Sequence, residues 1–208
     1  MHIEKGMVNP LRRANHILND PWYRECVQRN AACEENRRFC RHDLQHMLDV
    51  ARITYMLVLE GCVTTGNEIT TGVPEDLPWF KILAGVGIKD ITATTGKPGM
   101  LMQAKEVIYA TGLLHDMARW VECETGEDHA VAGARMAGEV LNRAGFDGAE
   151  QRIIVKAISE HRTGGSKASL LGQYICRADD LARPCGRCAA RDDCYKINRM
   201  ETAAMLLY

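Results

Sequence analysis

The sequence predicts an all-α protein, and three features of the chain support this. Apolar residues recur at helical spacing along most of its length. The dipeptides Asn9-Pro10 and Asp20-Pro21 each place a capping residue before a first-turn proline, which is typical of helix starts. Residues 61–100 interrupt the pattern with repeated Gly, Thr and Pro, which favours a loop. We therefore expect helices on both sides of one long Gly/Thr-rich insertion loop.

Each helix is expected from its own local pattern. Short amphipathic helices are predicted at about 8–18 and 20–32, and a long helix at about 34–60 ends before Gly61. Helices resume at about 101–122, 128–144, 148–162 and 168–182, with Asp128 and Asp147 as caps. We expect a single domain over residues 1–208. It would comprise an N-terminal helical appendage (1–33), a core (34–183) that contains the loop 61–100, and a cysteine-rich C-terminal segment (184–208).

Length and composition argue against several classes of protein. A chain of 208 residues is long enough to enclose a core, and a net charge of -1 argues against dedicated nucleic-acid or membrane-surface binding. No apolar run approaches the roughly 20 residues that span a bilayer, and the first residues lack the apolar part of a signal peptide. The nine cysteines are odd in number, so we expect reduced thiols or metal ligands in a cytoplasmic protein. A homo-oligomer is compatible with all of this.

The dipeptide His115-Asp116 is the most informative feature of the chain, because it follows an apolar stretch that is expected to be a buried helix. A buried imidazole and a buried carboxylate are costly unless they are paired or coordinate a metal. His46 shares a helix face with Val50, so it should point inward, either as a ligand or as an ordinary core histidine. Asp179 lies on another apolar-faced helix. Such donors suit a metal such as Mn, Fe or Zn.

Four segments of the chain resemble the HD-domain metal-dependent phosphohydrolases. They begin at His46, Leu113, Asp128 and Ala178, and the resemblance spans about residues 38–183. The stretch 160–165 is most similar to the branch that hydrolyses diadenosine polyphosphates at a two-iron centre. The resemblance implies an HD-domain helical bundle with one group of ligands for a first metal and two further histidines for a second. These residues are, in that order, His46, His115, Asp116 and Asp179, then His129 and His161.

The same resemblance implies a function. The expected substrate is a small molecule with a phosphate ester or anhydride, a nucleotide in the first place. The expected cofactor is one or two divalent ions (Fe, Mn, Ni or Zn) that activate the attacking water. Two alternatives stay open. Some HD-fold proteins with these six residues are di-iron oxygenases, and a non-catalytic metal-bound sensor would need the same ligands. His129 and His161 could also be ordinary histidines near helix ends.

Several side chains near the expected ligands could hold phosphate oxygens or carry protons. Arg119 is the first choice, because we expect it to project from the same helix face as His115-Asp116. Arg162, Lys167 and Arg183 are further candidates, although each could be a solvated surface charge. His42 lies four residues before His46, so both side chains could face one pocket. The alternative for His42 is a surface residue in a charged run.

The cysteines suggest a second, structural metal site. Cys185, Cys188 and Cys194 lie close together in the sequence, and Cys176 or Cys40 could supply a fourth thiolate for zinc or an iron–sulfur cluster. The alternative is reduced free thiols. Three cysteines recur every seven residues, which we interpret as one packed helix face: Cys26, Cys33 and Cys40.

Overall fold

The computed structural model describes residues 11–64, 77–84, 96–205 and 208. Within these ranges the chain is helical and forms no β-strand, which confirms the all-α prediction. Short 3₁₀ turns make up most of residues 185–203, and no helix in the described ranges could cross a membrane. The helices are α1 (Arg12–Asn19), α2 (Pro21–Cys33), α3 (Leu44–Thr64), α4 (Pro78–Ala84), α6 (Gly96–Leu114), α7 (Arg119–Thr125), α8 (His129–Ala144), α9 (Gly148–Glu160) and α10 (Leu170–Leu181).

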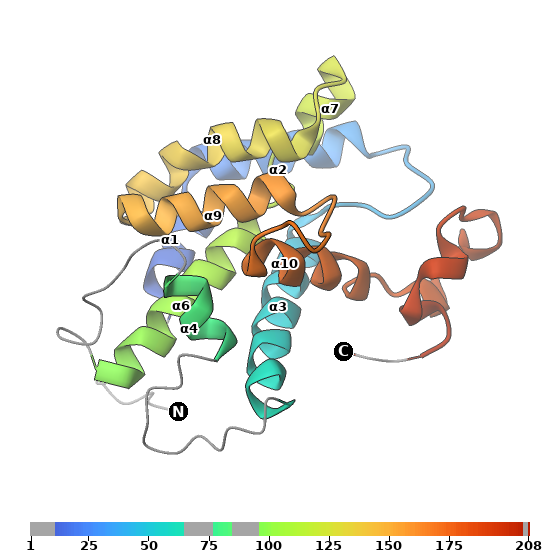
Figure 1. Ribbon diagram of the computed structural model, residues 1–208. Helices are drawn as coiled ribbons and strands as arrows, with labels where there is room; N and C mark the ends of the chain where they lie inside the picture. Colours follow the sequence, from blue (N-terminus) through green and yellow to red (C-terminus); the bar gives the residue numbers. More distant parts are fainter. Residues whose placement is uncertain (1–10, 65–76, 85–95, 206–207) are drawn as a thin grey trace, which may run out of the picture.

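Helices α3 and α6 form the centre of the bundle. α3 packs against both α6 and α10, while α8 and α9 lie side by side and cover α6 (Figure 1). The crossing of α3 and α6 depends on Gly112, because a Cβ at this position would lie 2.5 Å from the Cα of Ala51. The backbones therefore approach more closely than any other residue would allow. His46 precedes this contact on α3 and His115 follows it after α6, so the contact sets the spacing of the two histidines.

Four helices begin where the sequence predicts, at side chains that accept hydrogen bonds from otherwise unpaired backbone N–H groups. Asp20 accepts from Trp22 and Tyr23 at the start of α2, and the other caps are Asp128 of α8, Asp147 of α9 and Ser169 of α10. Residues 1–10, including Asn9-Pro10, lie outside the described residues.

Both predicted boundaries of the long helix and of the helix expected over 101–122 are wrong, and two of these differences affect the position of the site. The helix expected from 34 begins at Leu44, because Asp43 accepts a hydrogen bond from the backbone of His46 and caps the helix there. The helix expected over 101–122 ends at Leu114. The backbone N–H groups of Met117 and Arg119 bond to carbonyls three residues earlier, which makes a tight turn before α7. His115 and Asp116 therefore lie in a turn between two helices.

The segment 61–100 contains more helix than its composition predicts. α3 continues to Thr64, α6 begins at Gly96, and α4 lies between them. Pro78 stands at the first position of α4, where a proline costs no hydrogen bond, and Trp79 and Leu83 are buried against the core. Residues 65–76 and 85–95 lie outside the described residues.

Candidate metal centre

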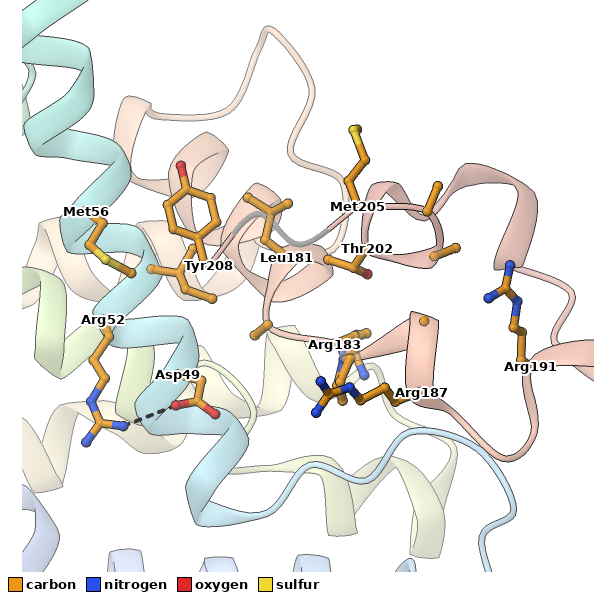
Figure 2. A pocket seen from close by; sticks show the side chains of 16 residues that line it. Asp49, Arg52, Met56, Leu181, Arg183, Arg187, Arg191, Thr202, Met205 and Tyr208 are labelled. Atoms are coloured by element: carbon orange, nitrogen blue, oxygen red, sulfur yellow. Dashed lines mark hydrogen bonds and ion pairs between the residues drawn. The ribbon is translucent and has the colours of Figure 1, made fainter.

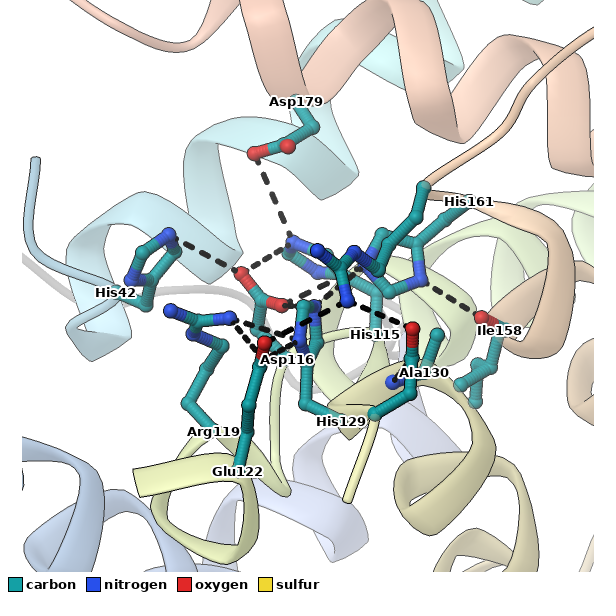
Figure 3. A network of polar contacts seen from close by, with 12 residues as sticks. His42, His115, Asp116, Arg119, Glu122, His129, Ala130, Ile158, His161 and Asp179 are labelled. Carbon is teal, nitrogen blue, oxygen red and sulfur yellow. Dashed lines mark hydrogen bonds and ion pairs between the residues drawn. The ribbon is translucent and has the colours of Figure 1, made fainter. Parts of the chain in front are cut away.

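Six side chains predicted as metal ligands meet at one place in the structure (Figure 3). They come from five separate parts of the bundle. His46 lies in the first turn of α3, His115 and Asp116 form the turn after α6, and Asp179 lies near the end of α10. The other two are His129, the first residue of α8, and His161, which directly follows α9. The cluster therefore depends on the packing of the whole bundle.

Asp116 stands at the centre of the cluster and its two carboxylate oxygens face opposite ways. Its Oδ2 lies 3.2 Å from Nε2 of His115 and 3.9 Å from Nε2 of His46. Its Oδ1 lies 3.0 Å from Nε2 of His129 and 3.5 Å from Nε2 of His161. The six residues thus form two groups that share one carboxylate.

The first group consists of His46, His115, Asp116 and Asp179, and the second consists of Asp116, His129 and His161. Within each group, one donor atom per residue lies within 4.8 Å of the others. Asp179 contributes Oδ1, which lies 2.9 Å from Nε2 of His46 and 4.0 Å from Nε2 of His115. In the second group, the Nε2 atoms of His129 and His161 are 3.2 Å apart.

Three of the imidazoles are fixed through their other nitrogen. Nδ1 of His115 donates to the carbonyl of Gly112 at 2.7 Å, and Nδ1 of His161 donates to the carbonyl of Ile158 at 2.7 Å. Nδ1 of His129 pairs with the carboxylate of Glu122. Because Nδ1 carries the proton in each of these bonds, the lone pair of Nε2 points toward the centre, as metal-binding histidines require.

The residues present fit a divalent metal. Among the described residues, Nε2 of His46, Nε2 of His115 and Oδ1 of Asp116 are buried and make no hydrogen bond. Unpaired buried polar atoms are costly and need an explanation. A cation between them would supply the missing partner, and mixed imidazole and carboxylate ligands suit Fe, Mn, Ni or Zn.

The charges of the cluster also favour a bound cation. Burial acts to raise the pKa of Asp116, but the neighbouring imidazoles, His115 first, hold this pKa well below its usual range. Burial likewise acts to raise the pKa of Asp179, and Arg183 and His46 lower it. Burial acts to lower the pKa of His115, but the charge of Asp116 raises it above its ordinary value. Both carboxylates are therefore ionised at neutral pH.

Among the predicted phosphate contacts, Arg119 and Arg183 lie at the centre. Arg119 was predicted to lie on the same helix as His115-Asp116. This prediction is wrong, because Arg119 is the first residue of α7 and the two other residues lie in the turn before it. Its guanidinium nevertheless lies 2.7 Å from Nδ1 of His129 and 2.6 Å from Glu122. Arg183 donates to Asp179 at 2.6 Å. The remaining two are exposed: Arg162 pairs with Asp128 at 2.6 Å, and Lys167 lies in the turn after α9.

His42 is buried and faces the cluster. Its Nδ1 lies 2.6 Å from a carboxylate oxygen of Glu34, and its Nε2 lies 3.8 Å from Oδ2 of Asp116. Burial lowers the pKa of His42 below its ordinary value. The alternative interpretation of His42 as a surface residue is therefore wrong.

Three residues that support the cluster were not predicted from the sequence. Glu34 orients His42, and Glu122 orients His129. Asn30, which is buried, donates to the carbonyl of Asp116 at 2.9 Å and accepts from the backbone of Trp120 at 2.8 Å. In the sequence all three look like polar residues of helix surfaces. Their role appears only when α2, α7 and α8 are placed together around the turn after α6.

The five cysteines predicted as a second metal site do not come together. No three metal-binding side chains that include a cysteine lie close enough to share an ion within the described ranges. Cys40, expected on the same helix face as Cys26 and Cys33, lies beyond the end of α2. Cys33 and Cys123 form a disulfide, which contradicts the expectation of reduced thiols at these two positions. Among the cysteines whose side chains the structure describes, the free thiols are Cys26, Cys40, Cys176, Cys185, Cys188 and Cys194.

Comparison with known proteins adds to this geometry. Residues 85–183 match the family model described as HD domain. A protein of Clostridium beijerinckii described as uncharacterized is 31% identical over 182 residues, which cover 88% of this chain and 90% of that protein. Bifunctional uridylyltransferase/uridylyl-removing enzymes of Bradyrhizobium sp. and Nitrobacter hamburgensis are 42% and 41% identical over 59 residues. These residues are 28% of this chain and 6% of each enzyme. No solved structure gives a significant match.

Proposed function

Because this chain belongs to the HD-domain superfamily, we propose that it is a metal-dependent phosphohydrolase. Its substrate is a small molecule with a phosphate ester or anhydride, and a nucleotide is the class we favour. The observation that carries this proposal is the position of Asp116, whose two oxygens each face a separate group of buried imidazoles. A carboxylate shared in this way suits two ions a few ångströms apart, which is the arrangement that holds a transferring phosphoryl group.

A bound divalent metal would polarise the phosphoryl oxygens and make water a stronger nucleophile at neutral pH. The chain's own residues would do the rest. Nε2 of His42 faces Asp116, and its Nδ1 is held by Glu34, so it is placed to accept a proton from water. The guanidinium of Arg119 lies beside His129, where it can stabilise negative charge on the phosphoryl group.

Two observations support a nucleotide as the substrate class. The relatives that match over 59 residues are named uridylyl-removing enzymes, and a uridylyl group is a nucleotide joined through its phosphate. The motif His161-Arg162-Thr163-Gly164 followed by Ala178-Asp179 resembles the diadenosine polyphosphate hydrolases. Both observations point toward a phosphate linked to a nucleoside.

The test is a substrate screen with defined metal content. Protein purified without oxygen is stripped with a chelator and reloaded separately with Fe²⁺, Mn²⁺, Ni²⁺ or Zn²⁺. Phosphate release is then measured with nucleoside mono-, di- and triphosphates and dinucleoside polyphosphates. We expect turnover in at least one reloaded sample and none in the stripped protein. His46→Ala should not recover activity, whereas His16→Ala, an exposed histidine on α1, should behave like the parent.

Two results would overturn the proposal. Oxygen consumption and an iron electron-spin signal without phosphate release would identify the protein as a di-iron oxygenase. Full metal binding without turnover of any compound would indicate a metal-bound sensor.

A further inference from the structure

A cavity of about 740 Å³ lies beside the metal centre, between α3, the end of α10 and the C-terminal segment (Figure 2). This volume is within the range of small-molecule sites. The side chains of Ile53 and Met56 from α3 and Leu181 from α10 contribute to its apolar lining, and Met205 and Tyr208 contribute from the C-terminal segment. The cavity can therefore accept a ligand with an apolar body.

The polar lining of the cavity is strongly basic. Four arginines and a single carboxylate line it, and the carboxylate, Asp49, already pairs with Arg52 at 3.1 Å. Arg187 and Arg191 are exposed, and neither forms an ion pair with another described residue. Unpaired guanidinium groups beside an apolar wall favour an anionic ligand, and their planar donors match phosphate oxygens.

Arg183 connects this cavity to the metal centre. On one side its Nη2 donates to Oδ1 of Asp179 at 2.6 Å. On the other side the residue lines the cavity, and its buried Nε has no hydrogen-bond partner among the described residues. Arg183 is thus shared by the metal centre and the cavity.

The C-terminal segment is held against the bundle on both sides of the cavity. Arg177 of α10 pairs with Glu201 at 3.1 Å, and the hydroxyl of Tyr208 donates to Glu60 of α3 at 2.5 Å. These contacts fix the wall that carries Arg187 and Arg191. The C-terminal segment therefore forms one wall of the cavity. None of the six candidate metal ligands lines it.

We infer that this cavity binds the part of the substrate that does not reach the metal. The ligand class is a phosphorylated small molecule, in which a second phosphate contacts Arg187 and Arg191 and an apolar ring system lies against Met56 and Tyr208. The inference rests on the proposed function, since it assigns the cavity to the substrate of the metal centre. It extends that function by requiring a substrate with a second anionic group.

The experiment separates binding from chemistry. ADP is titrated into metal-free protein and its affinity is measured by calorimetry, so that no bound metal contributes. We expect Arg187→Ala and Arg191→Ala each to weaken ADP binding about tenfold, because each loses a charge-assisted hydrogen bond. Arg199→Ala should bind ADP like the parent, because Arg199 is an exposed arginine of the same segment that lines a different cavity.

A second pair of variants tests the apolar wall. Met56→Glu places a charged carboxylate against the ring system of the ligand and should weaken ADP binding about tenfold, since the carboxylate would have to lose water without gaining a partner. Leu59→Glu is the matched control, because Leu59 is similarly exposed on α3 and lies outside the cavity. Melting curves of all variants establish that they are folded.

Turnover then identifies the ligand as substrate. With a nucleotide that the loaded enzyme hydrolyses, Arg187→Ala should raise KM about tenfold and change kcat little. A change in kcat at constant KM would overturn this assignment. The two possible failures are distinguishable. ADP binding that neither arginine variant affects overturns the binding site, whereas absence of any phosphate release by loaded parent protein overturns the proposed function.

Discussion

The metal centre and the C-terminal cysteine segment (184–208) differ in how sequence spacing relates to spatial position. The six residues of the metal centre are spread over more than 130 positions, from 46 to 179, yet their donor atoms meet. Cys185, Cys188 and Cys194 lie within ten positions of one another, yet they share no site. Ligands on helices are placed by helix packing, whereas ligands on a short irregular segment are placed by local turns.

The two regions also differ in how their side chains are anchored. In the metal centre, most imidazoles are buried and held through Nδ1 by a carbonyl or a carboxylate. In the cysteine segment, the backbone forms successive 3₁₀ turns, and Cys188 and Cys194 are only half-buried. Preorganised ligands need such a supporting shell. The comparison therefore predicts that variants in the two regions will have very different consequences.

The largest effect is expected for Asp116→Ala. This change removes the carboxylate that both groups share, so both ions should be lost and hydrolysis should fall more than about 100-fold. Metal analysis and turnover of the folded variant are the measurements. Asp180→Ala, a neighbouring carboxylate of α10 outside the cluster, should keep its metal. Full metal content in folded Asp116→Ala would disprove the ligand assignment.

A smaller effect is expected for His161→Ala. Because this histidine belongs only to the second group, metal content should drop from about two ions per chain to about one. Elemental analysis combined with anomalous scattering from crystals would count and locate the ions. The first group, including His46 and Asp179, should stay occupied. A parent protein with one ion and with His129 and His161 turned to solvent would reduce the centre to a mononuclear site.

Asn30→Ala tests whether α2 supports the metal centre. Loss of the amide leaves the carbonyl of Asp116 and the backbone of Trp120 without their partner, so unfolding free energy should fall by about 1–3 kcal/mol. Metal affinity should fall about tenfold, since the turn that carries Asp116 is less constrained. Chemical denaturation and metal titration measure the two effects. Asn198→Ala, an exposed asparagine in the C-terminal segment, is the control and should change neither.

The smallest effect is expected for Cys188→Ser. With no cluster of thiolates around it, the change should shift the unfolding free energy by no more than about 0.5 kcal/mol and leave metal content unchanged. A melting curve and elemental analysis are sufficient. Release of zinc or iron together with a marked loss of stability would show that the cysteines do bind a metal, and would remove the difference between the two regions.

The helical fold follows from local signals in the sequence, whereas the set of six clustered residues was predicted mainly from the resemblance to the HD-domain family. Capping residues such as Asp20 and Asp147 mark helix starts because they satisfy backbone groups within their own turn. The face shared by His46 and Val50 follows from helical periodicity, and both side chains are buried. These signals depend on residues near one another in the chain, so they can be read without the structure.

Other features depend on contacts between distant segments and could not be read in this way. The apolar pattern continues past Leu114, so nothing local shows that the helix ends before His115. Glu34 and Glu122 look like surface acids until α2, α7 and α8 are placed together. The Cys33–Cys123 disulfide joins positions 90 residues apart. The close spacing of Cys185, Cys188 and Cys194 predicted a metal site, but closeness along the chain did not bring their thiols together in space.

The close approach at Gly112 has a consequence for how this protein could change during evolution. Even a single added methyl group there would meet the backbone of Ala51 and force α3 away from α6. His46 and His115 would then move apart, although neither had been altered. The distance between the two histidines is therefore constrained by Gly112, a residue that has no side chain and binds no ligand. Descendants of this protein could exchange the surrounding charged residues gradually, but a change at this glycine would have to be matched by a new crossing of the two helices.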